Sequence, residues 1–211
     1  SIADMPPTDA VALINWFPLT TDVMFRKGYT QWATGINGTV QSLMVYNGPT
    51  QSKMFGATNG GDFYDVSSQG AVGAAVVTGQ TNGQWESVNV ATSGGNFMYC
   101  VNGVDKPQLY DGSTWTAIDS GSSPAISGVT TTNLTNVNVF KNRVWFVEKN
   151  SLKVWYLPTS SIGGTAQSLD FQSIAYKGGR LLAMATWTID AGYGIDDMAV
   201  FVTSEGQVIV Y

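Results

Sequence analysis

Short runs of alternating hydrophobic and polar residues follow one another along the chain, separated by turns rich in glycine and asparagine. Such alternation has the period of a half-buried β-strand, and Asn-Gly pairs supply the positive φ angles that hairpin turns need. One hydrophobic run recurs four times, at residues 53–57, 97–101, 143–147 and 199–202. Each copy is followed by a polar turn and a second strand that closes with a tyrosine, namely Tyr64, Tyr110, Tyr156 or Tyr211.

The closing tyrosines are 46, 46 and 55 residues apart. A period in this range is typical of radial or stacked β arrays, and the blade of a β-propeller is the closest match. We therefore predict an all-β fold, a β-propeller-like array of three- to four-stranded antiparallel meanders with about four blade-like repeats, and we expect the array to be incomplete. Residues 1–39 would form an N-terminal segment leading into the first blade, and the repeats would span roughly residues 40–80, 81–127, 128–176 and 177–211.

The connections between the predicted strands differ in length and composition. Only Lys141 and Asn142 separate residues 137–140 from residues 143–147, which predicts a two-residue hairpin loop. Residues 120–133 and 159–168 are rich in serine, threonine and glycine and are predicted to be surface loops between blades.

The fourth copy carries about nine extra residues, which we expect to project from one face of the array, where binding functions are often placed. Its candidate interaction residues are Asp190, Tyr193, Asp196 and Asp197. These carboxylates lack the alternate-residue spacing of a calcium loop, and no glutamate closes it, so a solvated hairpin tip is favoured over a metal site.

The composition argues against most chemical functions. The chain has no histidine, a single cysteine, 12% charged residues and a net charge of −5. Without histidine the usual general base and zinc ligand are missing, and an acidic chain offers no face for tight nucleic-acid binding. Cys100 lies in an apolar alternation and is predicted to be a small buried hydrophobe. We predict no catalytic residue, metal, cofactor or small-molecule substrate, no enzymatic activity and no membrane insertion.

Residues 110–115 resemble the Asp-box of sialidase-like propellers, in which a turn aspartate and glycine precede a Thr-Trp strand. Here Asp111 and Gly112 are adjacent instead of separated by one residue, and the motif occurs once, so a simple Asp-Gly hairpin is the stronger interpretation. Four tryptophans could line a sugar-binding platform, although their place inside predicted strands favours packing between blades: Trp85, Trp145, Trp155 and Trp187.

A second resemblance covers most of the chain. The order Asn-Trp-Phe-Pro at 15–18, Arg-Lys-Gly-Tyr at 26–29 and Ala-Thr-Gly at 33–35 resembles the start of tail nozzle, or tail tubular B, proteins of short-tailed bacteriophages and prophages. These proteins are related to the packaged-DNA stabilisation proteins of the tail hub. The likeness continues through residues 43–46, 52–57, 63–66, 106–112 and 140–146.

The resemblance implies a structural virion protein that self-associates as a ring, a hexamer by this analogy, against the tail adaptor and portal proteins. DNA would pass through the channel without sequence-specific binding, and the protein would assemble in the bacterial cytoplasm and reside in the virion tail. Family members are longer, and residues 207–211 would form a bare apolar edge, so we expect the chain to be the N-terminal part of a larger protein. The alternative is a carbohydrate- or host-surface-binding propeller module.

Overall fold

The computed structural model describes residues 12, 14–190 and 195–211, which divide into two units at residue 32. The first unit, residues 1–32, contains one antiparallel hairpin of β1 (Trp16–Pro18) and β2 (Val23–Phe25). The rings of Trp16 and Phe25 stack across this hairpin with centroids 3.7 Å apart. Most of its other apolar side chains are exposed, so the hairpin has little core of its own.

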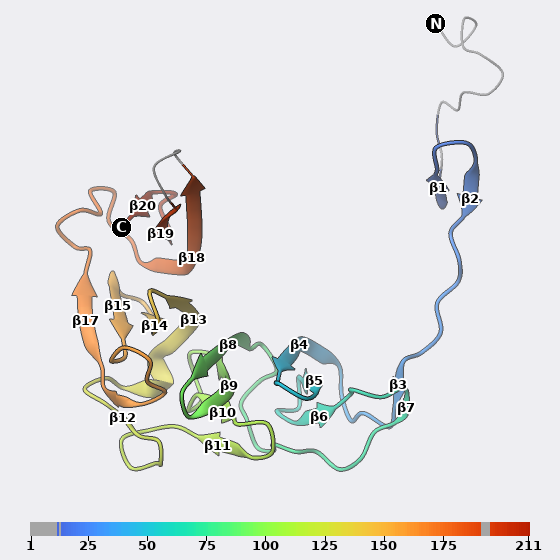
Figure 1. Cartoon of the computed structure of the whole chain (residues 1–211), viewed down its shortest axis with the longest axis horizontal. Coiled ribbons are helices and arrows are strands. Elements are labelled where there is room, and N and C mark those ends of the chain that lie inside the picture. Colours follow the sequence, from blue (N-terminus) through green and yellow to red (C-terminus); the bar gives the residue numbers. More distant parts are fainter. Residues whose placement is uncertain (1–11, 13, 191–194) are drawn as a thin grey trace, which may run out of the picture. The chain divides into compact units, whose positions relative to one another are not determined.

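The second unit, residues 33–211, is built from four antiparallel sheets that follow one another along the chain (Figure 1). Strands that follow one another pair within each sheet, except that a short strand of a separate pair comes before the last strand of the third sheet. Each sheet is therefore a meander of three or four strands, and the all-β, antiparallel prediction is confirmed. We call them the first to fourth sheets. Their strands are β4 (Val40–Asn47), β5 (Ser52–Thr58) and β6 (Phe63–Asp65); β8 (Glu86–Thr92), β9 (Gly95–Val101), β10 (Gln108–Tyr110) and β11 (Trp115–Ala117); β13 (Leu134–Phe140), β14 (Arg143–Glu148), β15 (Lys153–Tyr156) and β17 (Gln167–Asp170); and β18 (Leu181–Asp190), β19 (Ile195–Thr203) and β20 (Val208–Val210).

The hairpin between β13 and β14 has the two-residue loop that its sequence predicts. Phe140 pairs with Arg143, and the loop residues Lys141 and Asn142 adopt φ angles of 47° and 57°. Two consecutive positive φ angles are the mark of a type I′ turn, whose twist matches that of the flanking strands.

The two predicted surface loops are more structured than expected. Within them lie β12 (Ile126–Ser127) and β16 (Gly164–Thr165), which pair with each other in parallel, and a short 3₁₀ turn, η2 (Thr131–Asn133). Ile126 is fully buried, so the first loop contributes to the core, which the prediction of a surface loop missed. A similar short parallel pair, β3 (Ala33–Thr34) with β7 (Gly70–Ala71), lies before and after the first sheet.

Three hydrophobic cores hold the second unit together, and each is shared by two successive sheets. Alternate side chains of one strand point to opposite faces. In β9, Met98 and Cys100 therefore pack toward the first sheet, while Tyr99 and Val101 pack toward the third. Fully buried aromatic and large aliphatic side chains dominate the three cores: Tyr99, Phe55, Phe63, Phe146, Phe171, Phe201, Met44 and Met98.

The first strands of successive sheets also lie in contact, β4 with β8, β8 with β13 and β13 with β18. Asparagine side chains bridge two of these contacts. Asn89 Oδ1 accepts a hydrogen bond from the Asn47 backbone at 2.9 Å, and Asn89 Nδ2 donates to the Val45 carbonyl at 2.8 Å. Asn136 and Asn138 bond to the backbone of Met184 in the same way. Amide side chains thus satisfy strand edges that would otherwise lack partners.

Candidate functional site

The predicted interaction loop of the fourth copy lies in the hairpin of β18 and β19. Both strands extend into the inserted residues, so that Asp190 pairs with Ile195 and Thr188 pairs with Asp197 along the backbone. Thr188 Oγ1 donates a hydrogen bond to Asp197 Oδ1 at 2.7 Å. Tyr193 lies outside the described residues, and Asp196 is described only as the backbone partner of Ile189.

A different place gathers polar and aromatic side chains, namely the junction of the first and second sheets. A pocket of about 350 Å³ opens there, and a second of about 560 Å³ adjoins it; Lys53 and Asp65 line both. We call this region the Lys53 cleft. The smaller pocket is lined by Lys53, Phe55, Asp65, Val76, Tyr110, Ser113, Thr114 and Trp115.

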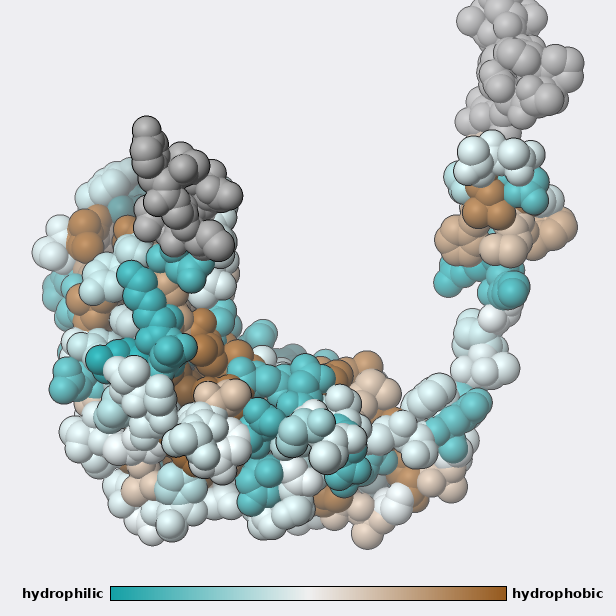
Figure 2. All heavy atoms as spheres, viewed as in Figure 1, coloured by the Kyte–Doolittle hydropathy of each residue, from teal (hydrophilic) through white to brown (hydrophobic). Residues whose placement is uncertain are grey.

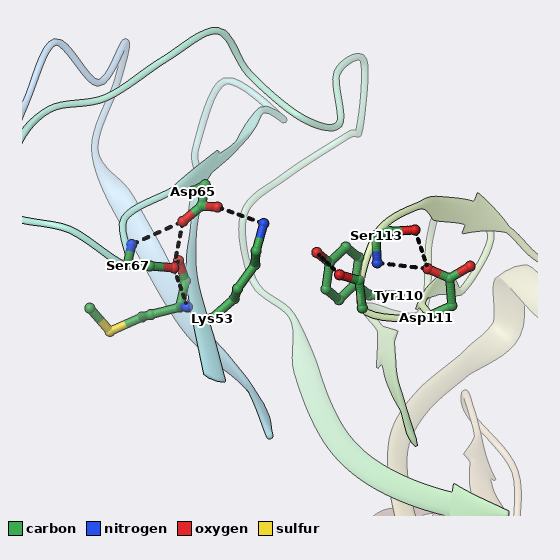
Figure 3. A network of polar contacts seen from close by, with 8 residues as sticks. Lys53, Asp65, Ser67, Tyr110, Asp111 and Ser113 are labelled. Carbon is green, nitrogen blue, oxygen red and sulfur yellow. Dashed lines mark hydrogen bonds and ion pairs between the residues drawn. The ribbon is translucent and has the colours of Figure 1, made fainter. Parts of the chain in front are cut away.

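Strand register brings the cleft residues together. Lys53 and Phe55 are alternate residues of β5 and share the face that points to the second sheet. Asp65 is the cross-strand partner of Phe55, and Tyr110 ends β10 of the neighbouring sheet (Figure 3). Tyr110 Oη donates to the Gly112 carbonyl at 2.8 Å, which fixes its ring in the cleft wall.

The charge of Lys53 is compensated inside the cleft. Its Nζ lies 3.3 Å from Asp65 Oδ2, and the Ser67 hydroxyl and backbone amide both donate to Asp65 Oδ1 (Figure 3). Partial burial raises the pKa of Asp65, but the bonds from Ser67 and Lys53 outweigh it and leave that pKa lowered. Burial lowers the pKa of Lys53, yet its interactions with Tyr110 and Asp65 leave the net pKa raised. Both groups therefore stay ionised as a pair at neutral pH.

The Asp-box-like residues form one wall of this cleft. Asp111 Oδ1 accepts hydrogen bonds from the backbone amides of Ser113 at 2.8 Å and Thr114 at 2.7 Å. Gly112 has a φ of 99°, and a Cβ atom there would lie 2.7 Å from the Tyr46 hydroxyl oxygen. These are the contacts of an Asp-Gly hairpin turn, so the carboxylate of Asp111 serves the turn.

Trp115 places a buried hydrogen-bond donor beside the cleft. Its indole Nε1 is buried and has no partner among the described residues, while its ring packs against Phe55, Phe63 and Tyr110 with centroids 4.9–5.3 Å apart. The cleft combines aromatic rings, hydroxyl groups and a neutralised ion pair. This arrangement suits binding of a polar ligand and contains no activated nucleophile.

Sequence reasoning did not find the Lys53 cleft. The available signal was Lys53 at the first position of the recurring run and Asp65 at the end of the following strand, ten residues after Phe55. Only the cross-strand register shows that Asp65 returns to the same face as Lys53.

Three of the four tryptophans that were predicted to pack between blades pack between sheets. Trp85 and Trp145 are buried in two of the inter-sheet cores, and Trp155 packs against the third. Trp187 is 58% exposed on β18. Cys100 is fully buried, as predicted, and burial raises the pKa of its thiol.

The outer faces of the end sheets are apolar and exposed. On the fourth sheet, Trp187, Val202, Val208 and Val210 point away from the core that contains Met184, Phe201 and Ile209. Val208 and Val210 are 58% and 51% exposed. On the first sheet, Leu43 and Val45 are 63% and 42% exposed. Elsewhere, the view in Figure 2 shows hydrophobic side chains interspersed among hydrophilic ones over the second unit.

Two kinds of feature are absent from the described residues. They contain no group of three or more histidine, cysteine, aspartate or glutamate side chains placed to hold a metal ion. Within the same residues, no helix has the length and apolarity that crossing a membrane requires. No protein-family model matches the chain, and no curated protein matches its sequence.

Proposed function

We propose that this chain is a structural subunit of a bacteriophage or prophage tail, forming part of the ring-shaped nozzle that retains and conducts the genome. The observation that carries the proposal is the exposed apolar face of the fourth sheet, with Trp187, Val202, Val208 and Val210. An apolar sheet face that is left uncovered is typical of an assembly surface.

The sheets support a propeller-like arrangement in this proposal. Each sheet packs face to face on the next, and the first strands of neighbouring sheets contact one another, as the inner strands of propeller blades do. The assignment to a phage tail rests on the family resemblance of the sequence. The packing of the sheets supports the propeller-like scaffold that this resemblance implies.

The occupant we propose for the exposed face is a second copy of the chain. Each inter-sheet core within the chain joins one apolar sheet face to another, and the first and fourth sheets each present one more such face. Contact between the fourth sheet of one copy and the first sheet of the next is heterologous, and heterologous contacts close into rings when the rotation permits. The net charge of −5 would let DNA pass such a ring without adhering.

A substitution in this face tests the proposal. Val202→Lys places a charge at the centre of the exposed face and leaves the buried Phe201 in place. We expect the unmodified chain to associate with rising concentration in light scattering and to form closed rings in electron micrographs. Val202→Lys should remain monomeric with an unchanged circular dichroism spectrum.

The matched control is Thr159→Lys, which adds the same charge at an exposed position of the loop that follows β15. It should associate like the unmodified chain. If the unmodified chain stays monomeric at every concentration, or if both variants associate equally, the fourth-sheet face is not an assembly surface.

A further inference from the structure

The junction of the third and fourth sheets contains another pocket, of about 290 Å³, with two cationic and several aromatic side chains. It is distinct from the Lys53 cleft and lies where Trp145 of β14 approaches Tyr211, which follows β20, with ring centroids 6.3 Å apart. Its lining residues are Phe140, Lys141, Arg143, Trp145, Tyr156, Leu169 and Tyr211.

The two pockets are related by the sequence repeat. Arg143 and Trp145 are alternate residues of β14, as Lys53 and Phe55 are of β5. Tyr211 exchanges two backbone hydrogen bonds with Ala199 on the fourth sheet, and Tyr110 pairs with Met98 on the second. Tyr110 ends β10 and Tyr211 directly follows β20, and both strands pack on the preceding sheet.

One position differs between them. The cross-strand partner of Phe55 is Asp65, whereas the cross-strand partner of Trp145 is Tyr156. Asp65 neutralises Lys53, but Tyr156 offers Arg143 only its ring, with the guanidinium carbon 5.4 Å from the ring centroid. The same register position therefore gives a neutral pocket at one junction and a cationic pocket at the other.

Arg143 has no acidic partner in the part of the chain that the structure describes. Its Nη1 donates to the Leu157 carbonyl at 3.2 Å, and within the described ranges neither Arg143 nor Lys141 forms an ion pair. Arg143 is half-buried, and a guanidinium has five donors, so most of them remain for a ligand. A partly buried cation without a carboxylate favours binding of an anion, and arginine is suited to bidentate contact with a carboxylate.

We propose that this pocket binds a sugar ring that carries a carboxylate. Tyr211, which is 59% exposed, offers apolar ring surface to the C–H groups of such a sugar, while Arg143 and Lys141 line the same pocket and can bind its carboxylate. A volume near the lower end of ligand pockets suits a single ring. A polyanion such as DNA is disfavoured, because the chain as a whole carries a net charge of −5.

Titration of the full chain with glucuronate and with glucose tests the proposal. Saturation-transfer NMR and tryptophan fluorescence should show saturable binding of glucuronate and at least tenfold weaker binding of glucose. Arg143→Gln should weaken glucuronate binding at least tenfold, and Arg143→Lys should weaken it less.

Two further variants keep the test decisive. Lys141→Gln changes an exposed turn residue, so it should fold normally and bind glucuronate several-fold more weakly, even if Arg143→Gln fails to fold. Lys53→Gln, at the repeat-related position, should bind as the unmodified chain does. Equal affinity for glucuronate and glucose, or unchanged glucuronate binding in Lys141→Gln and Arg143→Gln, would overturn the proposal. So would equal losses in Lys53→Gln and Arg143→Gln.

Discussion

At the scale of single residues, charged side chains in this protein mostly organise backbone. Asp105 is the clearest case, since its carboxylate joins two segments that the sequence separates by 24 positions. It accepts hydrogen bonds from the Thr81 amide at 2.8 Å, from the Thr81 hydroxyl at 2.7 Å and from Asn102 Nδ2 at 2.7 Å. Partial burial raises the pKa of Asp105, but these bonds outweigh it and lower the net pKa.

Asp105→Asn should therefore change how stability depends on pH. A carboxylate whose pKa is lower in the folded state stabilises the fold above its unfolded pKa, near pH 4, and this stabilisation is lost as the pH falls through the folded pKa. We expect Asp105→Asn to lower the unfolding free energy by about 1 kcal/mol at neutral pH, and the difference from the unmodified chain should shrink below pH 4. Urea unfolding at a series of pH values measures both effects.

Glu86→Gln is the control for that series, because Glu86 is exposed and accepts no hydrogen bond that the structure describes. Its stability should follow the unmodified chain at every pH. A pH-independent loss in Asp105→Asn would mean that Asp105 acts by packing and not by its charge.

At the scale of elements, the turns fix the registers that place side chains on one face or the other. Between β13 and β14, Lys141 and Asn142 must both hold positive φ angles, which asparagine tolerates and β-branched residues do not. This turn sets the pairing of Val139 with Val144 and so the alternation of the whole third sheet.

Asn142→Val should lower the unfolding free energy by about 1–2 kcal/mol, the strain of a β-branched residue in the left-handed region. Asn142→Gly keeps the same backbone accessible and should stay within about 0.5 kcal/mol of the unmodified chain. Chemical denaturation of the two variants checks this. Equal stabilities for Val and Gly would show that position 142 leaves the left-handed region in solution.

The strands and hairpins could be predicted from the sequence, but the pairing between faces could not. Alternation and Asn-Gly turns predicted the four meanders, and the apolar context of Cys100 predicted its burial. The tyrosine spacing suggested equivalent positions for Tyr110 and Tyr156, yet Tyr110 packs toward the preceding sheet and Tyr156 toward the following one. A shift of one residue in strand register turns a side chain to the opposite face of the sheet, and the spacing of residues in the sequence does not reveal such a shift. Both pockets depend on that register.

At the scale of the whole second unit, stability is divided among three separate cores. Each core joins only neighbouring sheets, so the coupling between sheets passes from one to the next as it does in repeat proteins. Loss of one core should therefore have its largest effect on the sheets beside it.

Phe201→Ala tests this division. Phe201 is fully buried in the core between the third and fourth sheets, and we expect its truncation to cost about 3–5 kcal/mol. Hydrogen exchange should show faster exchange in β18, β19 and β20, with β4 and β5 still protected. Val202→Ala, on the exposed side of the same strand, should leave both regions protected. Uniform loss of protection in Phe201→Ala would show that the four sheets unfold as one.

The position held by Asp65 in the first sheet and Tyr156 in the third has a consequence for how such arrays diversify. It lines a pocket at the junction of two sheets, where a carboxylate in one case and an aromatic ring in the other give the two pockets different charges. A repeated sheet can thus acquire a new binding preference through substitutions at the edge of a junction. The repeated sheets provide a common framework, and the residues at each junction can change independently of those at the others.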